Sequence, residues 1–242
     1  IVIVKHLSPC GIASADSQVD AYRAALDSDP ISAFGGIIAA NRTLEAETAA
    51  AISSLFVECI IAPGFAPEAR ELLAKKKNLR LVQMPDLDVT PKVEYRAIVR
   101  GILKQDVDLG DPAGADWRVV TDRQPTGEET AALRFAWQAC QHVKSNAIVF
   151  VRGEATVGIG GGQPNRVDCV RIAAQRAGEK AQGAVMSSDA FFPFPDSVEE
   201  AAKAGIRAIV QPGGSKRDQE SIDACNRLRI AMVFTGYRHF RH

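Results

Sequence analysis

The adjacent residues Lys5 and His6 carry the first side chains of the chain that could assist a reaction. They follow the apolar residues 1–4, which predict a buried strand, and α/β proteins often bind ligands at strand ends. A neutral imidazole can take a proton from an attacking amine, and a neighbouring ammonium can stabilise an oxyanion. From these two residues alone, a surface Lys beside a capping His is the better supported interpretation.

A glycine-rich segment, residues 158–163 with the sequence GIGGGQ, precedes a predicted helix that carries Arg166. Glycine lets a backbone come close to a ligand, and a helix N-terminus attracts anions. The spacing differs from the dinucleotide pattern G-x-G-x-x-G, and no Gly-Lys-Ser/Thr makes it a P-loop. A tight glycine turn and a phosphate-binding loop with Arg166 as charge partner are equally supported.

Residues 188–196, SDAFFPFPD, combine three aromatic residues with two prolines. Such a segment suits a rigid aromatic pocket for a planar heterocycle, with Asp196 available for polar contacts. The alternative is a buried turn whose Phe side chains belong to the core.

Residues 212–218, PGGSKRD, predict a turn before a helix, where free backbone N–H groups could hold a carboxylate or phosphate. Ordinary helix capping is the alternative. The chain closes with RHFRH at residues 238–242. A basic terminus is usually a solvated tail, but this one follows an apolar strand, which favours a tethered segment facing the cleft.

The composition of the 242 residues is that of a globular protein, with 46% hydrophobic and 24% charged residues. Because 29 basic residues balance 29 acidic ones, the net charge is zero, which argues against a general nucleic-acid surface. No apolar run approaches the ~20 residues of a membrane span, and no signal peptide opens the chain. Five scattered cysteines without C-x-x-C spacing argue against disulfides and zinc and fit a reducing cytosol.

The elements that position these residues alternate between strands and helices, which predicts an α/β fold. In the first half we expect helices at residues 16–26 (capped by Asp16), 44–56 and 67–77, and strands at 37–40, 59–62 and 79–84. Residues 106–126 predict an irregular connector. The second half predicts strands at 148–151, 208–211 and 230–234, with helices at 166–176, 197–204 and 219–228.

Four landmarks recur in the same order in both halves: Val-Lys, Ala-Phe, an apolar strand followed by Pro-Gly, and a closing helix and strand. Their shared order favours an internal duplication, with a first unit at residues 1–110 and a second at 111–242. A cleft between two such units is a natural ligand site. Because residues 1–4 begin inside a strand without a preceding cap, we also expect upstream sequence in the parent protein.

Taken together, eight segments resemble the AICAR transformylase domain of the bifunctional purine biosynthesis proteins, from Lys5 to His242. The aromatic DAFFPF segment and the Arg-His-Phe ending are the most specific, and the Pro-Gly turns the least. The segments are KHLSPCG at 5–11, SAFGG at 32–36, IAPG at 61–64, KSNA at 144–147, GIGGGQ at 158–163, residues 188–196, PGGS at 212–215 and TGYRHF at 235–240.

The resemblance implies two cytidine-deaminase-like α/β units in one transformylase domain, without zinc. It also implies transfer of a formyl group from 10-formyltetrahydrofolate to the 5-amino group of AICAR, giving FAICAR, with no metal required. His6 would be the proton acceptor and Lys5 the stabiliser of the developing charge. By the family pattern AICAR would contact Gly35, Glu58, Asn146, Arg166, Phe191 and Arg238, and the folate would contact Val167, Asp196, Ser215 and Lys216.

The resemblance further implies a cytoplasmic homodimer with shared active sites, and a parent protein that is also an IMP cyclohydrolase. An upstream Arg-Tyr segment that such proteins use for substrate is not in the 242 residues, which predicts weak AICAR binding by this chain alone. A non-catalytic nucleotide-binding module and a purely structural dimerisation domain are the competing interpretations.

Overall fold

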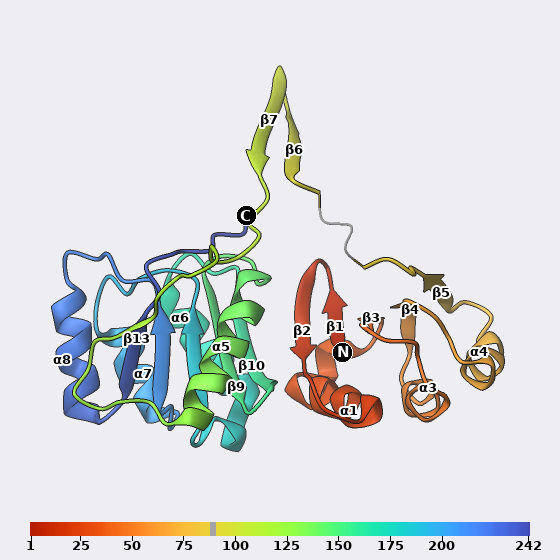
Figure 1. The fold of residues 1–242 in the computed structure, drawn as a ribbon, viewed down its shortest axis with the longest axis horizontal. Helices are drawn as coiled ribbons and strands as arrows, with labels where there is room; N and C mark the ends of the chain where they lie inside the picture. Colours follow the sequence, from red (N-terminus) through yellow and green to blue (C-terminus); the bar gives the residue numbers. More distant parts are fainter. Residues whose placement is uncertain (88–90) are drawn as a thin grey trace.

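The computed structural model describes residues 1–87 and 91–242, and it is a mixed α/β structure with two sheets side by side (Figure 1). A third, two-stranded sheet is a hairpin that projects away from both (Figure 1). The predicted α/β class is therefore confirmed.

The N-terminal sheet has the strand order β2-β1-β3-β4-β5. Its first three strands pair antiparallel, and β3, β4 and β5 pair in parallel. The strands are β1 (Val2–Lys5), β2 (Ser8–Ile12), β3 (Gly36–Ala39), β4 (Val57–Ala62) and β5 (Arg80–Gln83), and the helices are α1 (Gln18–Ser28), α2 (Pro30–Ala33), α3 (Ala46–Ser53) and α4 (Pro67–Ala74).

The C-terminal sheet has the order β10-β9-β11-β12-β13-β8, and its first five strands repeat the pairing pattern of the N-terminal sheet. Its strands are β8 (Arg118–Val119), β9 (Ala147–Arg152), β10 (Ala155–Gly161), β11 (Val185–Ser188), β12 (Ala208–Gln211) and β13 (Ala231–Phe234). Its helices are α5 (Gly127–Gln141), α6 (Arg166–Ala177), the 3₁₀ turn η1 (Gly178–Ala181), α7 (Asp196–Lys203) and α8 (Asp218–Leu228).

Two of the four recurring landmarks are not equivalent in space. Lys5 ends β1, whereas Lys144 precedes β9, the strand in the matching position. Likewise the Ala-Phe pair at Phe34 precedes β3, while the pair at Phe191 follows β11. The strands before Pro63 and Pro212 do match, because β4 and β12 occupy the same place in each sheet. Dipeptides recur by chance. The order in which the strands pair therefore decides which recurring landmarks occupy equivalent places in the two sheets.

The two sheets meet where β2 and β10 lie side by side. Ala13 and Ala155 form an antiparallel bridge, and Thr156 Oγ1 accepts a hydrogen bond from Ile12 N (2.9 Å) and donates to Ile12 O (3.2 Å). Because β2 runs antiparallel to β10, the carboxyl ends of β1, β10, β11, β12 and β13 lie at one shared edge. We call this the upper edge, since it is uppermost in Figure 1.

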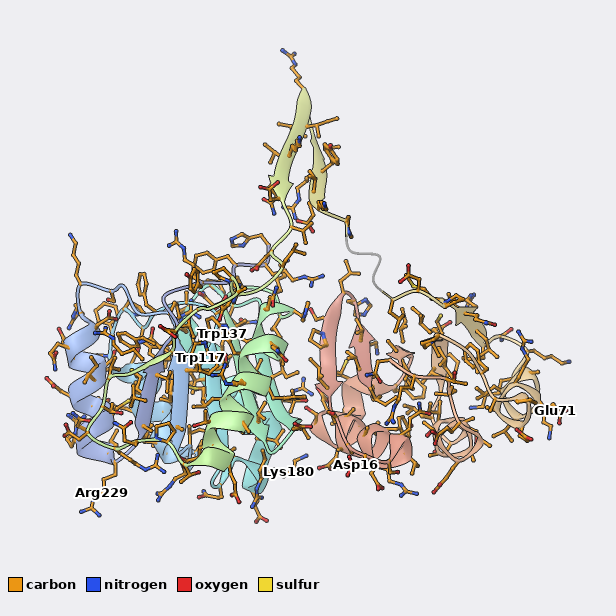
Figure 2. All side chains as sticks on the ribbon, viewed as in Figure 1. Asp16, Glu71, Trp117, Trp137, Lys180 and Arg229 are labelled. Carbon is orange, nitrogen blue, oxygen red and sulfur yellow. The ribbon has the colours of Figure 1, made fainter. Side chains whose placement is uncertain are left out.

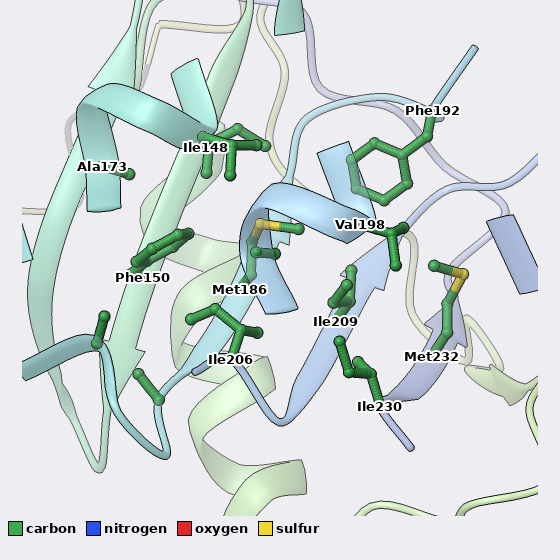
Figure 3. Packing of buried hydrophobic residues seen from close by; sticks show 14 of the residues in the cluster. Ile148, Phe150, Ala173, Met186, Phe192, Val198, Ile206, Ile209, Ile230 and Met232 are labelled. Atoms are coloured by element: carbon green, nitrogen blue, oxygen red, sulfur yellow. The ribbon is translucent and has the colours of Figure 1, made fainter. Parts of the chain in front are cut away.

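Apolar side chains pack most extensively beneath the C-terminal sheet. One side chain from each of the strands β9, β11, β12 and β13 is fully buried in a cluster that also contains Val198 of α7 (Figure 3). These side chains are Phe150, Met186, Ile209 and Met232. Each buried side chain of this size contributes roughly 1.5–3 kcal/mol. The packed sheet is therefore a rigid base for the loops at its upper edge.

Close packing of α6 on β10 explains the glycine-rich segment. A Cβ atom added to Gly158 would lie 2.2 Å from Ala173 O, and one added to Gly160 would lie 2.0 Å from Cys169 O. Both glycines belong to the strand rather than to a turn or a phosphate-binding loop, so both interpretations made from the sequence are wrong for them. The N-terminal sheet uses the same device, because a Cβ on Gly11 would lie 1.8 Å from Ala25 O of α1.

Other local predictions also need correction. The sequence Ser8-Pro9-Cys10-Gly11 is typical of a turn, yet it lies in strand β2. Helix α1 is capped by Ser17, whose side chain accepts from Asp20 N, rather than by Asp16. Helix α5 and the hairpin of β6 (Val93–Ile98) and β7 (Gly101–Asp106) were not expected. The irregular connector is confirmed, apart from the short strand β8.

Candidate functional site

Lys5 and His6 lie at the upper edge, where β1 turns into β2. His6 and Leu7 form the two-residue turn, and both have positive φ values, 53° and 65°. Two left-handed residues in succession define a type I′ hairpin turn, which normally selects Asn or Gly. The exposed imidazole therefore stands on a backbone that its residue type disfavours, a pattern that clusters at functional sites.

A pocket of about 190 Å³ lies beside this turn. It is open to solvent on one side and mixes polar with apolar walls. Because one wall comes from β10, the pocket lies at the junction of the two sheets. Its lining residues are Lys5, His6, Ser8, Pro9, Cys10, Asp29, Ser32 and Ile159.

The ammonium group of Lys5 is anchored at this pocket, since its Nζ donates to Phe34 O at 2.6 Å. Gly35 follows directly and has φ 71°, and a Cβ there would lie 4.0 Å from Lys5 Nζ. The rings of Phe34 and Phe56, 5.2 Å apart, are both partly exposed beside it. Lys5 and His6 thus line one opening, and Gly35 lies beside the ammonium group of Lys5.

Glu58 lies near the same edge, but its carboxylate faces a different partner. It accepts a hydrogen bond from Arg80 Nη1 at 2.9 Å, and the ion pair is exposed. Solvent screens the attraction within an exposed ion pair, so the pair fixes the orientation of its side chains only weakly. Contact between Glu58 and a ligand remains a prediction.

Cys10 is the cysteine of the pocket. Burial raises the pKa of its thiol, with a further increase from the charge of Asp29. The thiol therefore stays protonated at neutral pH and is a poor nucleophile. Asp29 itself is paired with Arg176 of α6 at 2.7 Å, a link between the two sheets, and it caps α2 through Ser32 N.

A second group of polar side chains lies at the upper edge of the C-terminal sheet. Arg166, the first residue of α6, donates through Nη1 to Asp189 and to Ser188 Oγ (3.0 Å), and through Nη2 to Asn146 Oδ1 (2.7 Å). Ser145 Oγ donates to the other carboxylate oxygen of Asp189. We call these five residues the arginine cluster. Asp189 was part of the aromatic segment recognised in the sequence, residues 188–196, but no role was assigned to it.

The aromatic segment divides between the core and the surface. Phe192 is fully buried, Phe191 is half-buried and Phe194 is 50% exposed. Arg217 lies over the ring of Phe194, 4.6 Å from its centroid, which joins this segment to the turn at residues 212–218. The core interpretation therefore holds for Phe192, and an aromatic pocket for a heterocycle remains a prediction.

The remaining candidates surround these two loops. Asp196 begins α7 and accepts from Ser197 N at 2.7 Å, and Ser215 Oγ accepts from Arg217 N at 3.1 Å. Lys216 is exposed, and Val167 is half-buried in the first turn of α6. The side-chain hydrogen bonds of Asp196 and Ser215 lead to the residues one and two positions further on, and neither α7 nor α8 has a side-chain cap. Contact of these residues with a ligand remains a prediction.

The basic C-terminal segment is tethered through His239. This residue is only 4% exposed, and its ring nitrogens lie 2.6 Å from Asp108 Oδ2 and 3.1 Å from Asp111 Oδ1. The indoles of Trp117 and Trp137, close together in Figure 2, both donate to Asp111. The neighbouring Arg238 is exposed, and its guanidinium lies 5.4 Å from the centroid of the Phe240 ring. Contact between Arg238 and a ligand remains a prediction.

Among the described residues, the two groups share an edge without a recorded contact. In strand order β1 is separated from β9 by β2 and β10, and these two strands belong to different sheets joined by the bridge of Ala13 to Ala155 at the opposite edge. His6 therefore lies across the junction from the arginine cluster. Convergence of both groups on one ligand remains a prediction.

Residues 1–87 and 91–242 contain no group of three or more His, Cys, Asp or Glu placed to hold a metal ion. In the same ranges, no helix has the length and apolar character to cross a membrane.

Fold and site together define an α/β protein of two similarly ordered sheets, with polar and basic side chains gathered at one edge and a pocket beside the β1–β2 turn. The family model described as the AICARFT/IMPCHase bienzyme matches residues 1–176. The chain belongs to this family.

The relatives point to the same family. The chain is 54% identical over 241 residues to the bifunctional purine biosynthesis protein PurH of Synechocystis sp., covering 100% of this chain and 47% of the relative. It is 52% identical over 240 residues to the protein of the same name from Nostoc punctiforme (99% and 47%) and 54% identical over 243 residues to that of Desulfitobacterium hafniense (99% and 47%). The chain thus spans about half the length of the curated relatives it matches.

Proposed function

We propose that this chain carries out formyl transfer in purine biosynthesis, as part of an enzyme that is also an IMP cyclohydrolase. It moves the formyl group of 10-formyltetrahydrofolate to the 5-amino group of AICAR, giving FAICAR and tetrahydrofolate. The observation that carries this proposal is His6 on its left-handed turn, beside Lys5 at the mouth of a pocket, in a chain of this family.

The chemistry required matches the residues at the upper edge. The AICAR amine is a poor nucleophile, because its lone pair delocalises into the imidazole carboxamide. A base must therefore take its proton during attack, and a cation must stabilise the tetrahedral oxyanion. We assign the first role to His6 and the second to Lys5, whose Nζ is held by Phe34 O.

We further assign the substrate contacts along the upper edge. AICAR contacts Gly35 and Glu58 on the N-terminal sheet and Asn146, Arg166, Phe191 and Arg238 on the C-terminal one. The folate contacts Val167, Asp196, Ser215 and Lys216. These assignments are supported by the position of each residue in loops or first helical turns at that edge, apart from the strand residue Glu58.

The two sheets are, we propose, cytidine-deaminase-like units of one transformylase domain, divided at residue 110. The repeated strand order and the shared glycine packing of Gly11 and Gly160 against a helix support a duplication. No zinc is assigned to either unit.

A homodimer with shared active sites is part of the same proposal. The hairpin of β6 and β7 supports it, because an isolated two-stranded hairpin is only marginally stable in water. Both of its faces expose apolar residues, including Tyr95, Val99, Ile102 and Leu103. Shared sites would also bring a second arginine cluster to the pocket of His6.

We place the enzyme in the cytoplasm, since all five cysteines are free, and we assign it neither nucleic-acid nor membrane partners. The zero net charge supports the absence of a general nucleic-acid surface.

The test is an assay of the natural full-length protein with AICAR and 10-formyltetrahydrofolate. Tetrahydrofolate should form in an amount equal to FAICAR and IMP combined, because the proposed cyclohydrolase activity of the same protein converts FAICAR to IMP. Calorimetry with AICAR alone separates the alternatives: binding without formyl transfer would show a non-catalytic nucleotide-binding module, and no binding would show a purely structural domain.

A further inference from the structure

Asp189 is the most deeply buried charged residue of the upper edge. Its exposed fraction is 0%, and it follows β11 directly. All its polar groups are engaged: the carboxylate accepts from Arg166 and Ser145, the backbone N donates to Ala147 O (3.2 Å), and the backbone O accepts from His239 N (3.1 Å). The residue is therefore fixed in position from four directions.

Stability alone is a weak reason for this ion pair. Taking a carboxylate and a guanidinium out of water costs several kcal/mol for each ion, and apolar replacements of such pairs are often neutral or stabilising. The arginine side chain is 7% exposed, so solvent screens the pair very little. A buried pair at the edge to which the proposed function assigns the nucleotide therefore calls for a functional reason.

Asp189 determines which N–H groups of Arg166 are free. A guanidinium has five N–H groups. Three hydrogen bonds lead to Asp189, Ser188 and Asn146, and the other two N–H groups take no part in them. Because two rigid partners hold Nη1, the direction of the remaining donors is set before any ligand arrives.

The constraint extends through Arg166 to Asn146. The side-chain oxygen of Asn146, Oδ1, accepts a hydrogen bond from Arg166. The side-chain nitrogen of Asn146, Nδ2, donates to Gln163 O (2.8 Å) and Pro164 O (3.1 Å). The amide orientation is thus fixed between the arginine and the turn after β10. A displaced guanidinium would release both side chains.

We propose that Asp189 is a positioning residue that aligns Arg166, and through it Asn146, for contact with the nucleotide. Asp189 does not touch the substrate itself. The proposal rests on the proposed function for the identity of the ligand, and it adds a residue that the family pattern stated above did not assign.

The first test is Asp189→Asn in the natural full-length protein. The change keeps the side-chain shape but removes the charge that orients the guanidinium. We expect the KM for AICAR to rise by roughly 10-fold or more, the size expected for a misaligned charge-assisted hydrogen bond, while kcat changes less than about threefold.

Glu129→Gln is the matched control. It replaces a carboxylate by an amide in another ion pair to an arginine, Arg123–Glu129, whose side chains are partly buried at 26% and 15% exposure. This pair lies at the start of α5, outside the arginine cluster. A loss of stability without a change in KM is expected, which separates positioning from a general weakening of the fold.

A second measurement does not depend on activity. Nitrogen-15 NMR of arginine side chains should show slow rotation of the Arg166 guanidinium in the unmodified protein and in Glu129→Gln, and fast rotation in Asp189→Asn. If Asp189→Asn does not fold, Ser145→Ala removes only the hydrogen bond to the second carboxylate oxygen and should still increase the rotation rate.

Unchanged Arg166 rotation in whichever variant folds would overturn the positioning role, as would an unchanged KM. If the unmodified protein transfers no formyl group, the proposed function fails. The rotation measurement then still decides the role of Asp189 by itself.

Discussion

At the scale of single residues, the backbone of His6 is the least expected feature of the site. A left-handed conformation costs a residue other than glycine roughly 1–2 kcal/mol, and His6 and Leu7 both adopt it. The tight turn makes the imidazole project from the sheet edge instead of folding against it. No sequence pattern indicated this, because neither residue is typical of such a turn.

His6→Asn tests the proton acceptor with little change to the turn, since Asn tolerates the left-handed conformation. Formyl transfer by the full-length protein should fall by ~10²-fold or more, because an amide cannot take the amine proton. Turnover is measured as tetrahydrofolate formed, with the melting temperature recorded in parallel.

The control for that prediction is Leu7→Asn, the same kind of change one residue later, at a side chain that is 82% exposed. Its turnover should stay within about twofold of the unmodified protein. A His6→Asn variant that turns over as fast as Leu7→Asn would remove His6 from the mechanism.

At the scale of elements, β10 and α6 depend on glycine for their close approach. Gly160→Ala would place a Cβ atom 2.0 Å from a backbone carbonyl oxygen, which neither element can avoid without moving. We expect a loss of about 2–3 kcal/mol in the free energy of unfolding, measured by urea denaturation.

Gly127→Ala provides the comparison, because a Cβ at the first position of α5 meets open space. Its free energy of unfolding should change by less than about 1 kcal/mol. Equal losses in the two variants would show that β10 has room for a side chain and that its glycines have another purpose.

Helix α5 begins with a capping box that is linked to an ion pair. Glu129 accepts from Thr126 N (2.9 Å) and from Arg123 Nη2 (2.6 Å), and its own N donates to Thr126 Oγ1. Burial opposes the charge, but the bonds to Arg123 and Thr126 together hold the pKa of Glu129 below its ordinary value of 4.5.

A lowered folded-state pKa means that the unfolded chain binds the proton more readily. The stabilisation is complete above pH 4.5 and is lost as the pH falls through the lower folded-state pKa. Glu129→Gln should therefore cost about 1–2 kcal/mol at pH 7, with a shrinking difference below pH 4.5.

Denaturation curves across that pH range measure the effect, with Glu128→Gln as a control in the same helical turn. A difference between Glu129→Gln and the unmodified protein that persists unchanged at low pH would contradict this explanation.

At the scale of the whole molecule, the projecting hairpin predicts an association surface. Replacing Ile102 and Leu103 with Glu would place charges on its two faces, both exposed in the single chain. The proposed dimer should weaken by at least about 100-fold, because each buried apolar anchor contributes roughly 2 kcal/mol or more. Sedimentation of the full-length protein measures this.

Leu228→Glu, at the end of α8, makes the same chemical change at another partly exposed leucine and should leave the assembly unchanged. If the hairpin variant sediments like Leu228→Glu, the hairpin is not part of the dimer interface.

Local order along the chain was largely predictable. Residues 208–211 were predicted as a strand and form β12, and the predicted helix at 166–176 differs from α6 by one residue. Apolar periodicity and turn residues act over a few positions, so they can be recognised without a structure. Helix α5 and the β6–β7 hairpin were not predicted. Almost all residues of the hairpin are exposed, so its sequence does not alternate between apolar residues on a buried face and polar residues on an exposed one.

The sequence by itself determined the α/β class and the inventory of reactive side chains, because both depend on neighbours along the chain. The tertiary structure decided the use of those side chains. The hydrogen bond of Ile12 to Thr156 joins residues 144 positions apart and sets the shared edge, and Arg166 meets Asp189 only because α6 and β11 pack together. Contacts over such separations leave no local pattern, so only the folded chain reveals them.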